Sequence, residues 1–376
     1  MRKILFIDSY YPEFVSNLSQ TFIDSSYADI RSELDVNRFG TGSALAFEFS
    51  KIGWETQLVV PNFRVMQDAW LEENGFSRSI ASGWNYGPYI ARLPGADRLA
   101  LLLNHLHSAI YEQVKSFRPD VVYVQDLNLI PPALIKRIRE FTNLVVGEIA
   151  SPLPPWRLIK SYDMVLSALQ PLVEQLKNRG MRAHWVPLGF DLRNWEECLT
   201  KDIDREIDLT FVGSISRHHK QSTLPLVKRL SEASIRFAIY GPANSGVALS
   251  EIGLGDFYKG VAWGSKMFEI LSNSKIVINR HTEFAQGYAT NMRMYESTGM
   301  GALLITDATK NLEDLFRVNE EVVTYENPDD AADRIVNLLS NGSEIQRIAL
   351  QGQNRTHQEH TYSHRVQNIL EYIVSQ

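Results

Sequence analysis

Short apolar stretches rich in β-branched residues alternate with longer amphipathic stretches along the whole chain. In the first half, these apolar stretches are KILFID, TQLVVP, DVVYVQD, LVVGEIA, MVLSAL and HWVPLG. In the second half, they are DLTFVGS, IRFAIYGP, FYKGVAW, KIVINRH, GALLITD and EVVTYE. Strands that alternate with helices indicate a parallel sheet covered on both faces. The pattern therefore predicts an α/β fold with two consecutive sheets.

A stretch rich in Pro, Gly and charged residues separates the two series. Residues 187–205, PLGFDLRNWEECLTKDIDR, are more typical of a hinge than of a core. We therefore expect one domain over 1–186 and a second over 187–359. The end of the chain predicts an amphipathic helix within 360–376 that packs back on the first domain. Its apolar positions recur at helical spacing: Val366, Ile369, Leu370 and Ile373.

Two such halves suggest where a ligand binds. Open α/β sheets bind ligands beyond the carboxyl ends of their strands. We therefore expect the ligand of this protein to lie in a cleft between the two domains.

Composition and charge exclude several classes of protein. The chain has 376 residues, 44% hydrophobic and 22% charged, with a net charge of −6 and no basic run, so nucleic acid is not an expected partner. Its single cysteine, Cys198, forms no intrachain disulfide and belongs to no metal-binding cysteine cluster. The first apolar stretch is too short for a signal peptide, and no stretch is long enough for a transmembrane helix. We expect a cytoplasmic protein, and peripheral membrane contact stays open.

The segment TFVGSISRHHKQSTLPLVKRL suits a phosphate group. It reads as a strand, a turn at Gly213, and a helix from about Ser222. Backbone N–H groups at such a turn can approach phosphate, and Arg217 and Lys220 add positive charge. A solvated loop that carries these two cations is an equally good interpretation.

The next strand ends suggest a surface for the flat base of a nucleotide. They place Tyr240, Gly241 and Val261 in loops that can pack a base through backbone and apolar contacts. His281 follows a later strand, and contact with a donor sugar is one interpretation of it. None of the histidines has metal-ligand spacing, so no metal site is expected.

The segment NMRMYESTGMGALLITD carries an arginine and a glutamate three residues apart. In a helix, Arg293 and Glu296 lie on one face. A carboxylate can accept hydrogen bonds from both ribose hydroxyls, and a guanidinium can bind phosphate in a bidentate manner. An exposed ion pair is the alternative, but the glycines at 299 and 301 favour close packing of this helix.

A turn of small residues precedes this helix. Its backbone N–H groups lie at the positive end of the helix, where they would face phosphate. The candidate residues of the turn are Gly287, Tyr288 and Ala289.

Together these motifs resemble a known family. The motif NxRxYExxGxGxLLxTD, the segment YENPDDAADRIVNLL and the closing AxxGQNRTHQEHTYSHR resemble the donor domain of GT-B glycosyltransferases. Within that fold they are similar to the group that includes the spore-maturation-type and family 4 enzymes. The resemblance covers about residues 205–370, and the first half resembles only a generic GT-B acceptor domain. It implies two Rossmann-like domains that face each other across a cleft.

The resemblance also implies an activity: sugar transfer from a nucleotide diphosphate, with no metal and no cofactor. It gives Glu296 the ribose role and Arg217 and Lys220 the diphosphate role, while Asn291 and Arg293 line the donor pocket. Family 4 enzymes usually have a second glutamate eight positions earlier, where this sequence has Tyr288. The resemblance therefore implies no second acid and no stereochemical outcome.

The first half should bind the acceptor and supply a proton acceptor at a strand end. Asp8, Asp126 and Glu148 each follow an apolar stretch there, and we select Asp126 as the catalytic base. A cap or loop hydrogen bond is the alternative role of each. Gly42 opens an apolar helix that can face the acceptor, and Trp84 can stack on a sugar ring or pack in the protein.

These observations favour a glycosyltransferase of the kind used in polysaccharide biosynthesis. Its partners would be a nucleotide sugar, such as a hexose donor, and a carbohydrate or other hydroxyl acceptor. A GT-B epimerase and a catalytically silent sugar-nucleotide-binding module are the competing hypotheses.

Overall fold

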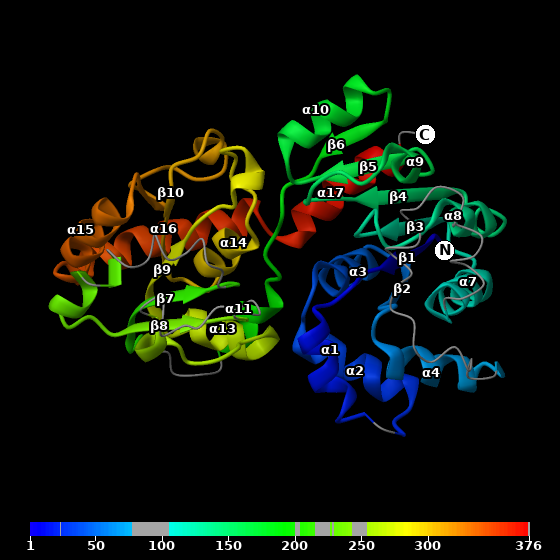
Figure 1. Ribbon diagram of the computed structural model, residues 1–376, viewed down its shortest axis with the longest axis horizontal. Coiled ribbons are helices and arrows are strands. Elements are labelled where there is room, and N and C mark those ends of the chain that lie inside the picture. The colour runs from blue at the N-terminus through cyan, green and yellow to red at the C-terminus, as the bar shows by residue number, and fades with distance from the viewer. Residues whose placement is uncertain are drawn as a thin grey trace. The chain divides into compact units, whose positions relative to one another are not determined.

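Each predicted series of apolar stretches forms its own parallel sheet in the computed structural model (Figure 1). The structure describes residues 1–22, 24–76, 105–199, 204–214, 226–227, 229–242 and 254–374. Two compact units divide the chain. Unit 1 comprises Met1–Pro187 and Val366–Gln376, and unit 2 comprises Leu188–Arg365.

Unit 1 has a six-stranded sheet in the order β2-β1-β3-β4-β5-β6 among its described residues. Its strands are β1 (Lys3–Ile7), β2 (Glu55–Val59), β3 (Val121–Val124), β4 (Leu144–Glu148), β5 (Met164–Ser167) and β6 (Ala183–Trp185). Every pair is parallel, and β1 lies between β2 and β3 with Ile4 opposite both Thr56 and Val121. Its helices are α1 (Pro12–Ser19), α2 (Tyr27–Asn37), α3 (Thr41–Lys51), α4 (Arg64–Glu73), α7 (His105–Phe117), α8 (Pro132–Ile138), α9 (Trp156–Ile159) and α10 (Gln170–Asn178). The four central strands are buried almost throughout, as expected for a parallel sheet covered on both faces, and the edge strands β2 and β6 are partly exposed.

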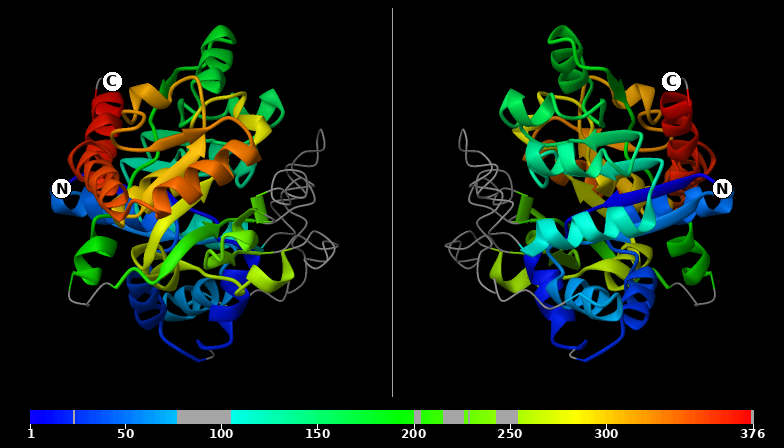
Figure 2. Two further views of the ribbon diagram at one scale, coloured as in Figure 1. Left: turned by 90° about the vertical axis from the view of Figure 1, so that its left-hand side faces the viewer. Right: turned by 90° about the vertical axis from the view of Figure 1, so that its right-hand side faces the viewer.

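Unit 2 has a five-stranded parallel sheet in the order β11-β10-β9-β7-β8 among its described residues. Its strands are β7 (Ile207–Val212), β8 (Phe237–Tyr240), β9 (Ser274–Asn279), β10 (Leu303–Asp307) and β11 (Val323–Tyr325). Its helices are α11 (Arg193–Cys198), α13 (Gly264–Ser272), α14 (Met292–Gly299), α15 (Pro328–Leu339) and α16 (Gly342–Glu359), with short 3-10 turns at Gly255–Phe257, Glu283–Ala285 and Leu312–Asp314. In the left view of Figure 2, unit 2 faces the viewer and shows helices against its sheet.

One predicted strand is absent. The stretch FYKGVAW contributes only an isolated bridge between Tyr258 and Ile239. Gly260 interrupts it with a positive φ of 101°, a conformation that a regular strand does not contain. Phe257 and Tyr258 of this stretch pack against the core of unit 2 from a loop that leads into α13.

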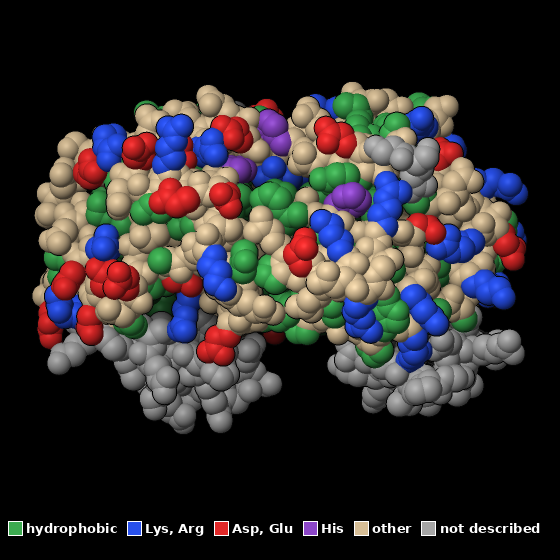
Figure 3. All heavy atoms as spheres, turned by 90° about the horizontal axis from the view of Figure 1, so that it is seen from above, with side chains coloured by type: hydrophobic (Ala, Val, Ile, Leu, Met, Phe, Trp, Pro, Cys, Tyr) green, Lys and Arg blue, Asp and Glu red, His purple; other side chains and the backbone are tan. Residues whose placement is uncertain are grey.

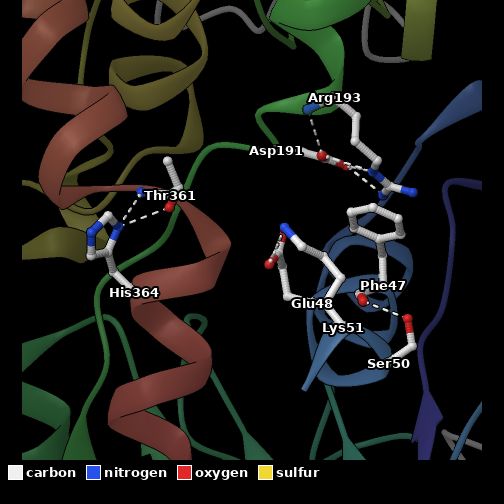
Figure 4. A network of polar contacts seen from close by, with 8 residues as sticks. All are labelled: Phe47, Glu48, Ser50, Lys51, Asp191, Arg193, Thr361 and His364. Atoms are coloured by element: carbon white, nitrogen blue, oxygen red, sulfur yellow. Dashed lines mark hydrogen bonds and ion pairs between the residues drawn. The ribbon is translucent and has the colours of Figure 1, made fainter. Parts of the chain in front are cut away.

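The predicted hinge is also more ordered than expected. Residues 193–198 form α11, and Phe190 and Cys198 are buried. Phe190 packs where Gly299 has no side chain, since a Cβ there would lie 2.6 Å from the ring. Asp191 accepts hydrogen bonds from Arg193, which fixes the start of α11 (Figure 4). The interpretation of residues 187–205 as hinge rather than core is therefore wrong for Phe190 to Cys198.

The final helix, α17 (Tyr362–Val374), has the predicted amphipathic pattern. Val366, Ile369 and Ile373 are buried. Within unit 1, the ring of Tyr372 stacks on His184 with the centroids 4.0 Å apart. At the start of the helix, the side chain of Thr361 contacts Nδ1 of His364 at 2.8 Å (Figure 4). No helix in the described part of the chain is both long enough and apolar enough to cross a membrane.

Gly241→Ala is expected to destabilise unit 2 by about 3 kcal/mol, as for overpacking of a buried site. Gly241 has a φ of 142°, and a Cβ there would lie 1.9 Å from the carbonyl oxygen of Gly213. Urea unfolding measures the loss. Gly342→Ala is the control, because nothing lies within 4 Å of a Cβ at the start of α16. Equal unfolding midpoints for the two variants would contradict this steric argument.

Candidate functional site

The helix α14 begins just beyond the carboxyl edge of the unit 2 sheet. Its N-cap is Asn291, whose side chain accepts a hydrogen bond from the N–H of Arg293 at 2.8 Å. The role of Asn291 in the described structure is therefore to start the helix that carries the arginine and the glutamate. An asparagine is among the preferred residues at this position because its side chain satisfies an otherwise unpaired N–H.

The predicted proximity of Arg293 and Glu296 is confirmed. Nη1 of Arg293 lies 2.7 Å from Oε2 of Glu296, which is buried, and 13% of the Arg293 side chain is exposed. Nε of Arg293 also donates to the carbonyl oxygen of Val212 at 3.0 Å, and Nη1 lies 3.1 Å from the sulfur of Met267. The alternative of an exposed ion pair is therefore wrong, because the guanidinium links α14 to the end of β7 and to α13.

Burial gives Glu296 an unusual electrostatic setting. Its exposed fraction is 6%, and burial raises the pKa of its carboxyl group while the charge of Arg293 lowers it. Oε2 accepts no well-aligned hydrogen bond from any described residue, although the Arg293 guanidinium is in ionic contact with it. Buried polar atoms are rarely left in this condition. The carboxylate therefore retains capacity to accept a hydrogen bond from a ligand.

The turn before α14 is built differently from the prediction. The N–H of Tyr288 donates to the carbonyl of Ala285, and the N–H of Ala289 donates to Oδ1 of Asn311 at 2.6 Å. These two N–H groups thus already donate hydrogen bonds within the protein, so the prediction that they face phosphate is wrong for them. The carbonyl of Gly287, whose φ is 81°, accepts from the N–H of Lys310 at 2.8 Å.

Lys310 is a cation at this turn that sequence reasoning missed. Its Nζ lies 5.2 Å from the centre of the Tyr288 ring, and the side chain is otherwise exposed. The pairing joins residues far apart in the sequence, so no local motif signals it. An exposed ammonium group beside the start of α14 can bind an anion there.

The ends of β7 and β8 approach each other closely. The N–H of Gly213 donates to the carbonyl of Tyr240 at 3.0 Å, and the N–H of Gly241 donates to the carbonyl of Gly260 at 3.0 Å. Val261 follows Gly260 and is one of the exposed large apolar residues. The four predicted positions Gly213, Tyr240, Gly241 and Val261 therefore belong to one neighbourhood at the edge of the sheet.

A histidine and an aspartate meet at the ends of β9 and β10. Nδ1 of His281 lies 2.8 Å from Oδ1 of Asp307, and Nε2 lies 3.1 Å from the sulfur of Met294. Burial raises the pKa of Asp307, but the hydrogen bonds and charge of His281 outweigh it and leave that pKa lowered. Asp307 closes the motif NxRxYExxGxGxLLxTD, but the sequence gives no signal of its pairing with His281, because the two are 26 residues apart.

In unit 1, the three acidic candidates lie at the carboxyl ends of neighbouring strands. Oδ1 of Asp126 accepts from the backbone N–H of Asn128 at 2.8 Å and from its side chain at 2.9 Å, which is the loop role weighed as an alternative. Asp8 accepts from the N–H of Gly42 at 3.1 Å, and Glu148 accepts from the hydroxyl of Tyr123 at 2.8 Å. Gly42 thus donates to a protein carboxylate at the start of α3.

Three predicted site residues, Arg217, Lys220 and Trp84, lie outside the described residues. Among the side chains that the structure does describe, no group of three or more His, Cys, Asp or Glu is placed to hold a metal ion. On the face drawn in Figure 3, basic and acidic side chains are interspersed and form no continuous basic patch in its described part.

The two parallel sheets with their flanking helices define the GT-B class of fold. The chain resembles Anabaena HepE in complex with UDP and glucose, at 13% identity and a TM-score of 0.61 with 100% of each chain covered. It also resembles sucrose-phosphate synthase from Thermosynechococcus elongatus, at 11% identity and a TM-score of 0.58 with 100% of this chain and 99% of that one covered. A putative UDP-N-acetylglucosamine 2-epimerase from Listeria monocytogenes matches at 14% identity and a TM-score of 0.54, with 100% and 96% covered. At such low identity these similarities establish the fold.

Sequence comparison adds a match to a family model over part of the chain. Residues 217–371 match the family described as glycosyl transferase-like. No curated protein matches the chain. The family match and the fold confirm the resemblance to the group 1 glycosyltransferases, and the matched segment contains α14 with its buried ion pair.

Proposed function

We propose that the protein is a nucleotide-sugar-dependent glycosyltransferase. It transfers a hexose from a nucleotide diphosphate to a hydroxyl group of a carbohydrate or other acceptor, without a metal ion. The observation that carries this proposal is the buried Arg293–Glu296 pair at the start of α14, inside the segment that matches the glycosyl transferase-like family. The UDP and UDP-glucose bound to the structurally similar HepE support a nucleotide sugar as the donor.

In this proposal, Glu296 binds the ribose hydroxyls of the donor. Arg293 keeps the buried carboxylate ionised, so that it accepts hydrogen bonds and does not donate one. Since Nε and Nη1 of Arg293 contact protein atoms, the guanidinium positions Glu296 more than it binds phosphate. The helix start at Asn291 fixes both side chains.

We assign the remaining predicted donor residues to the base or to the diphosphate according to their positions at the edge of the unit 2 sheet. The neighbourhood of Gly213, Tyr240, Gly241 and Val261 packs against the base. The turn of Gly287, Tyr288 and Ala289 borders the diphosphate, where Lys310 supplies positive charge. Arg217 and Lys220 stay predicted diphosphate ligands.

Charge neutralisation is the main demand of the reaction. When the acceptor oxygen bonds to the anomeric carbon, the nucleotide diphosphate leaves with the electron pair of the broken bond, and fixed cations stabilise its negative charge. The acceptor binds to unit 1, near Gly42 and Trp84. A carboxylate at the edge of that sheet takes the acceptor proton, and Asp126 stays the choice made from sequence.

A panel of nucleotide sugars tests the proposal. We expect release of nucleotide diphosphate that depends on an added sugar acceptor and persists in EDTA. Glu296→Gln should weaken donor binding in calorimetry by about 1.5–3 kcal/mol, the size of a hydrogen bond to a charged group. Glu344→Gln is the matched control, because Glu344 pairs with Arg347 at the same spacing on the exposed face of α16.

Three results would contradict the proposal in different ways. Donor binding without turnover would favour a silent binding module. Release of nucleotide diphosphate without any acceptor would favour an epimerase or hydrolase. Equal donor affinity of the Glu296 and Glu344 variants would remove Glu296 from the donor site.

A further inference from the structure

Asp8 occupies a central position at the carboxyl edge of the unit 1 sheet. It follows β1, and its own N–H donates to the carbonyl of Val59 at 3.0 Å. Its carboxylate accepts the N–H of Gly42 in the first turn of α3, and its exposed fraction is 7%. The backbone of Asp8 is thus fixed against the end of β2, and its side chain is directed at the start of a helix.

Two further carboxylates face Asp8 from neighbouring strands. Glu148 ends β4, where Tyr123 and Gln125 hydrogen-bond to it, and Asp126 follows β3. Burial raises the pKa of Asp8 to about 7, and the charges of Glu148 and Asp126 raise it while the Gly42 N–H lowers it. Burial also raises the pKa of Glu148 to about 6. Near neutral pH this edge therefore carries fewer negative charges than carboxyl groups.

Two tyrosine hydroxyls beside these carboxylates have no hydrogen-bond partner in the described part of the chain. Tyr10 is 3% exposed and Tyr162 is 4% exposed. After burial, the largest effect on the Tyr10 hydroxyl is the charge of Asp8, and the effect on Tyr162 is the charge of Asp126; each raises the hydroxyl pKa. A Cβ at Gly40 would lie 2.5 Å from Cε1 of Tyr10 and 2.8 Å from Oδ2 of Asp8, so ring and carboxylate flank one point.

Buried hydroxyl groups without a hydrogen-bond partner are uncommon, and a bound ligand can supply the missing hydrogen bond. Carboxylates and phenol groups together accept and donate hydrogen bonds, which is the chemistry that recognises a polyhydroxylated molecule. The glycines at 40 and 42 let Tyr10 and Gln125 pack close to Asp8, because a Cβ at either glycine would collide with one of these side chains. This combination is therefore more than a group of acidic residues.

We propose that Asp8 is the proton acceptor for the attacking hydroxyl of a sugar acceptor, with Tyr10 and Tyr162 as hydrogen-bonding groups around it. This role rests on the proposed function. The acceptor O–H proton passes to Asp8, the acceptor oxygen bonds to the anomeric carbon, and the bond from that carbon to the phosphate oxygen breaks. The nucleotide diphosphate takes the electron pair, and Asp8 then releases the proton to solvent.

Asp8 fits this role better than Asp126 does. Oδ1 of Asp126 already accepts two hydrogen bonds from Asn128, so this oxygen is engaged within its own loop. A general base works best when its pKa lies near the operating pH. The surroundings of Asp8, which combine burial with two neighbouring carboxylates, produce that condition.

Comparison of amide variants tests the assignment. Asp8→Asn should lower acceptor-dependent turnover by at least about 100-fold, the lower end for general base catalysis, while donor affinity stays within about twofold. Glu174→Gln in α10 is the control, since Glu174 is exposed on the surface. Asp126→Asn distinguishes the two candidates. The proposal is overturned if Asp8→Asn keeps more than a tenth of the turnover, or if Asp126→Asn alone abolishes it.

The pH dependence of turnover provides a second test, because a residue with only a structural role would not set the pH at which turnover rises. Turnover should rise with pH through about 7, as Asp8 loses its proton. In Glu148→Gln, the loss of a neighbouring charge should shift that rise to lower pH. The other charged or titratable groups that act on Asp8 and Tyr10 remain in this variant: Asp126, Arg31 and Asp35. An unmoved profile in an active variant contradicts the proposal.

The failure of this inference and the failure of the proposed function are distinguishable. Carbon-13 NMR titration of the carboxyl groups follows Asp8 without any substrate. A carboxyl that titrates near 4 in the wild-type protein overturns the assignment of Asp8 even if sugar transfer is observed. A protein that binds no nucleotide sugar, while Asp8 titrates near 7, overturns the proposed function and with it the catalytic role.

Discussion

Replacement of Arg205 by methionine is expected to destabilise unit 2 by about 3–5 kcal/mol, because it removes several hydrogen bonds from a charged donor, each of which contributes about 1.5–3 kcal/mol. The guanidinium donates to three carbonyl oxygens, those of Ser272 at 2.7 Å, Ser274 at 2.9 Å and Met300 at 3.2 Å. These lie at the end of α13, the start of β9 and the end of α14. One side chain thus joins three elements, and its loss leaves their carbonyls without these donors.

Burial lowers the pKa of Arg205 to about 10, so the side chain is still charged at neutral pH. Arg205→Lys should lie between the wild type and the methionine variant, because an ammonium keeps the charge but cannot reach three carbonyls in the geometry of a guanidinium. Urea unfolding followed by tryptophan fluorescence measures each change.

Arg236→Met is the matched control for Arg205. Arg236 belongs to the same unit, but its side chain is exposed, and its partner Asp208 keeps Lys275 as a second counter-charge. Surface ion pairs contribute little to stability, so the unfolding midpoint of this variant should stay close to that of the wild type. If the two methionine variants unfold at the same urea concentration, the three carbonyl contacts do not stabilise the unit.

Sequence patterns predicted the sheets well because each buried parallel strand is a short apolar stretch of its own. Eleven of the twelve quoted stretches contain a strand, and FYKGVAW does not. Phe257 and Tyr258 pack against the core from the loop between β8 and α13, while Val261 is exposed and Gly260 breaks the extended backbone. A short apolar stretch indicates burial and does not require strand pairing.

The burial of the segment after Pro187 was missed for a different reason. Phe190 is buried because Gly299, more than a hundred residues later, leaves room for its ring. The β-bridge between Phe190 and Thr361 likewise joins distant parts of unit 2. The composition of a segment indicates whether it can be exposed to solvent. It does not show that a distant residue such as Gly299 packs against that segment.

The candidate sites likewise contain contacts that follow from local sequence and contacts that depend on distant residues. Arg293 and Glu296 were predictable as neighbours because helix geometry alone brings positions three apart together. The contact of His281 with Asp307 and that of Asp8 with Gly42 depend on the order of strands in each sheet. Sequence placed Asp8 at a strand end, but only the sheet order shows which carboxylates and hydroxyls surround it.

Arg293→Met is expected to lower the stability of unit 2 at pH 8 by about 3–5 kcal/mol, because it leaves the carboxylate of Glu296 buried without its counter-charge. Burial already raises the pKa of Glu296, and Arg293 is the group that lowers it. Without Arg293 the folded-state pKa rises further above the unfolded value. The stability that comes from protonation is then fully present below the unfolded pKa and is lost as the pH rises through the folded pKa. The variant should therefore be closer to the wild type at pH 5 than at pH 8.

The double variant Arg293→Met with Glu296→Gln separates charge from packing. A neutral glutamine removes the buried charge, so the double variant should regain most of the lost stability at pH 8 and lose the excess pH dependence. Arg347→Met is the control, since it breaks an exposed pair with Glu344 at the same spacing and should unfold like the wild type. If the double variant is as unstable at pH 8 as Arg293→Met alone, then the contacts of Arg293 with Val212 and Met267 hold the helix, and its pairing with Glu296 contributes little.

Calorimetry with UDP on the same proteins shows whether the restored fold binds nucleotide. Recovery of the fold without recovery of binding is the result expected if the carboxylate of Glu296 contacts the ribose.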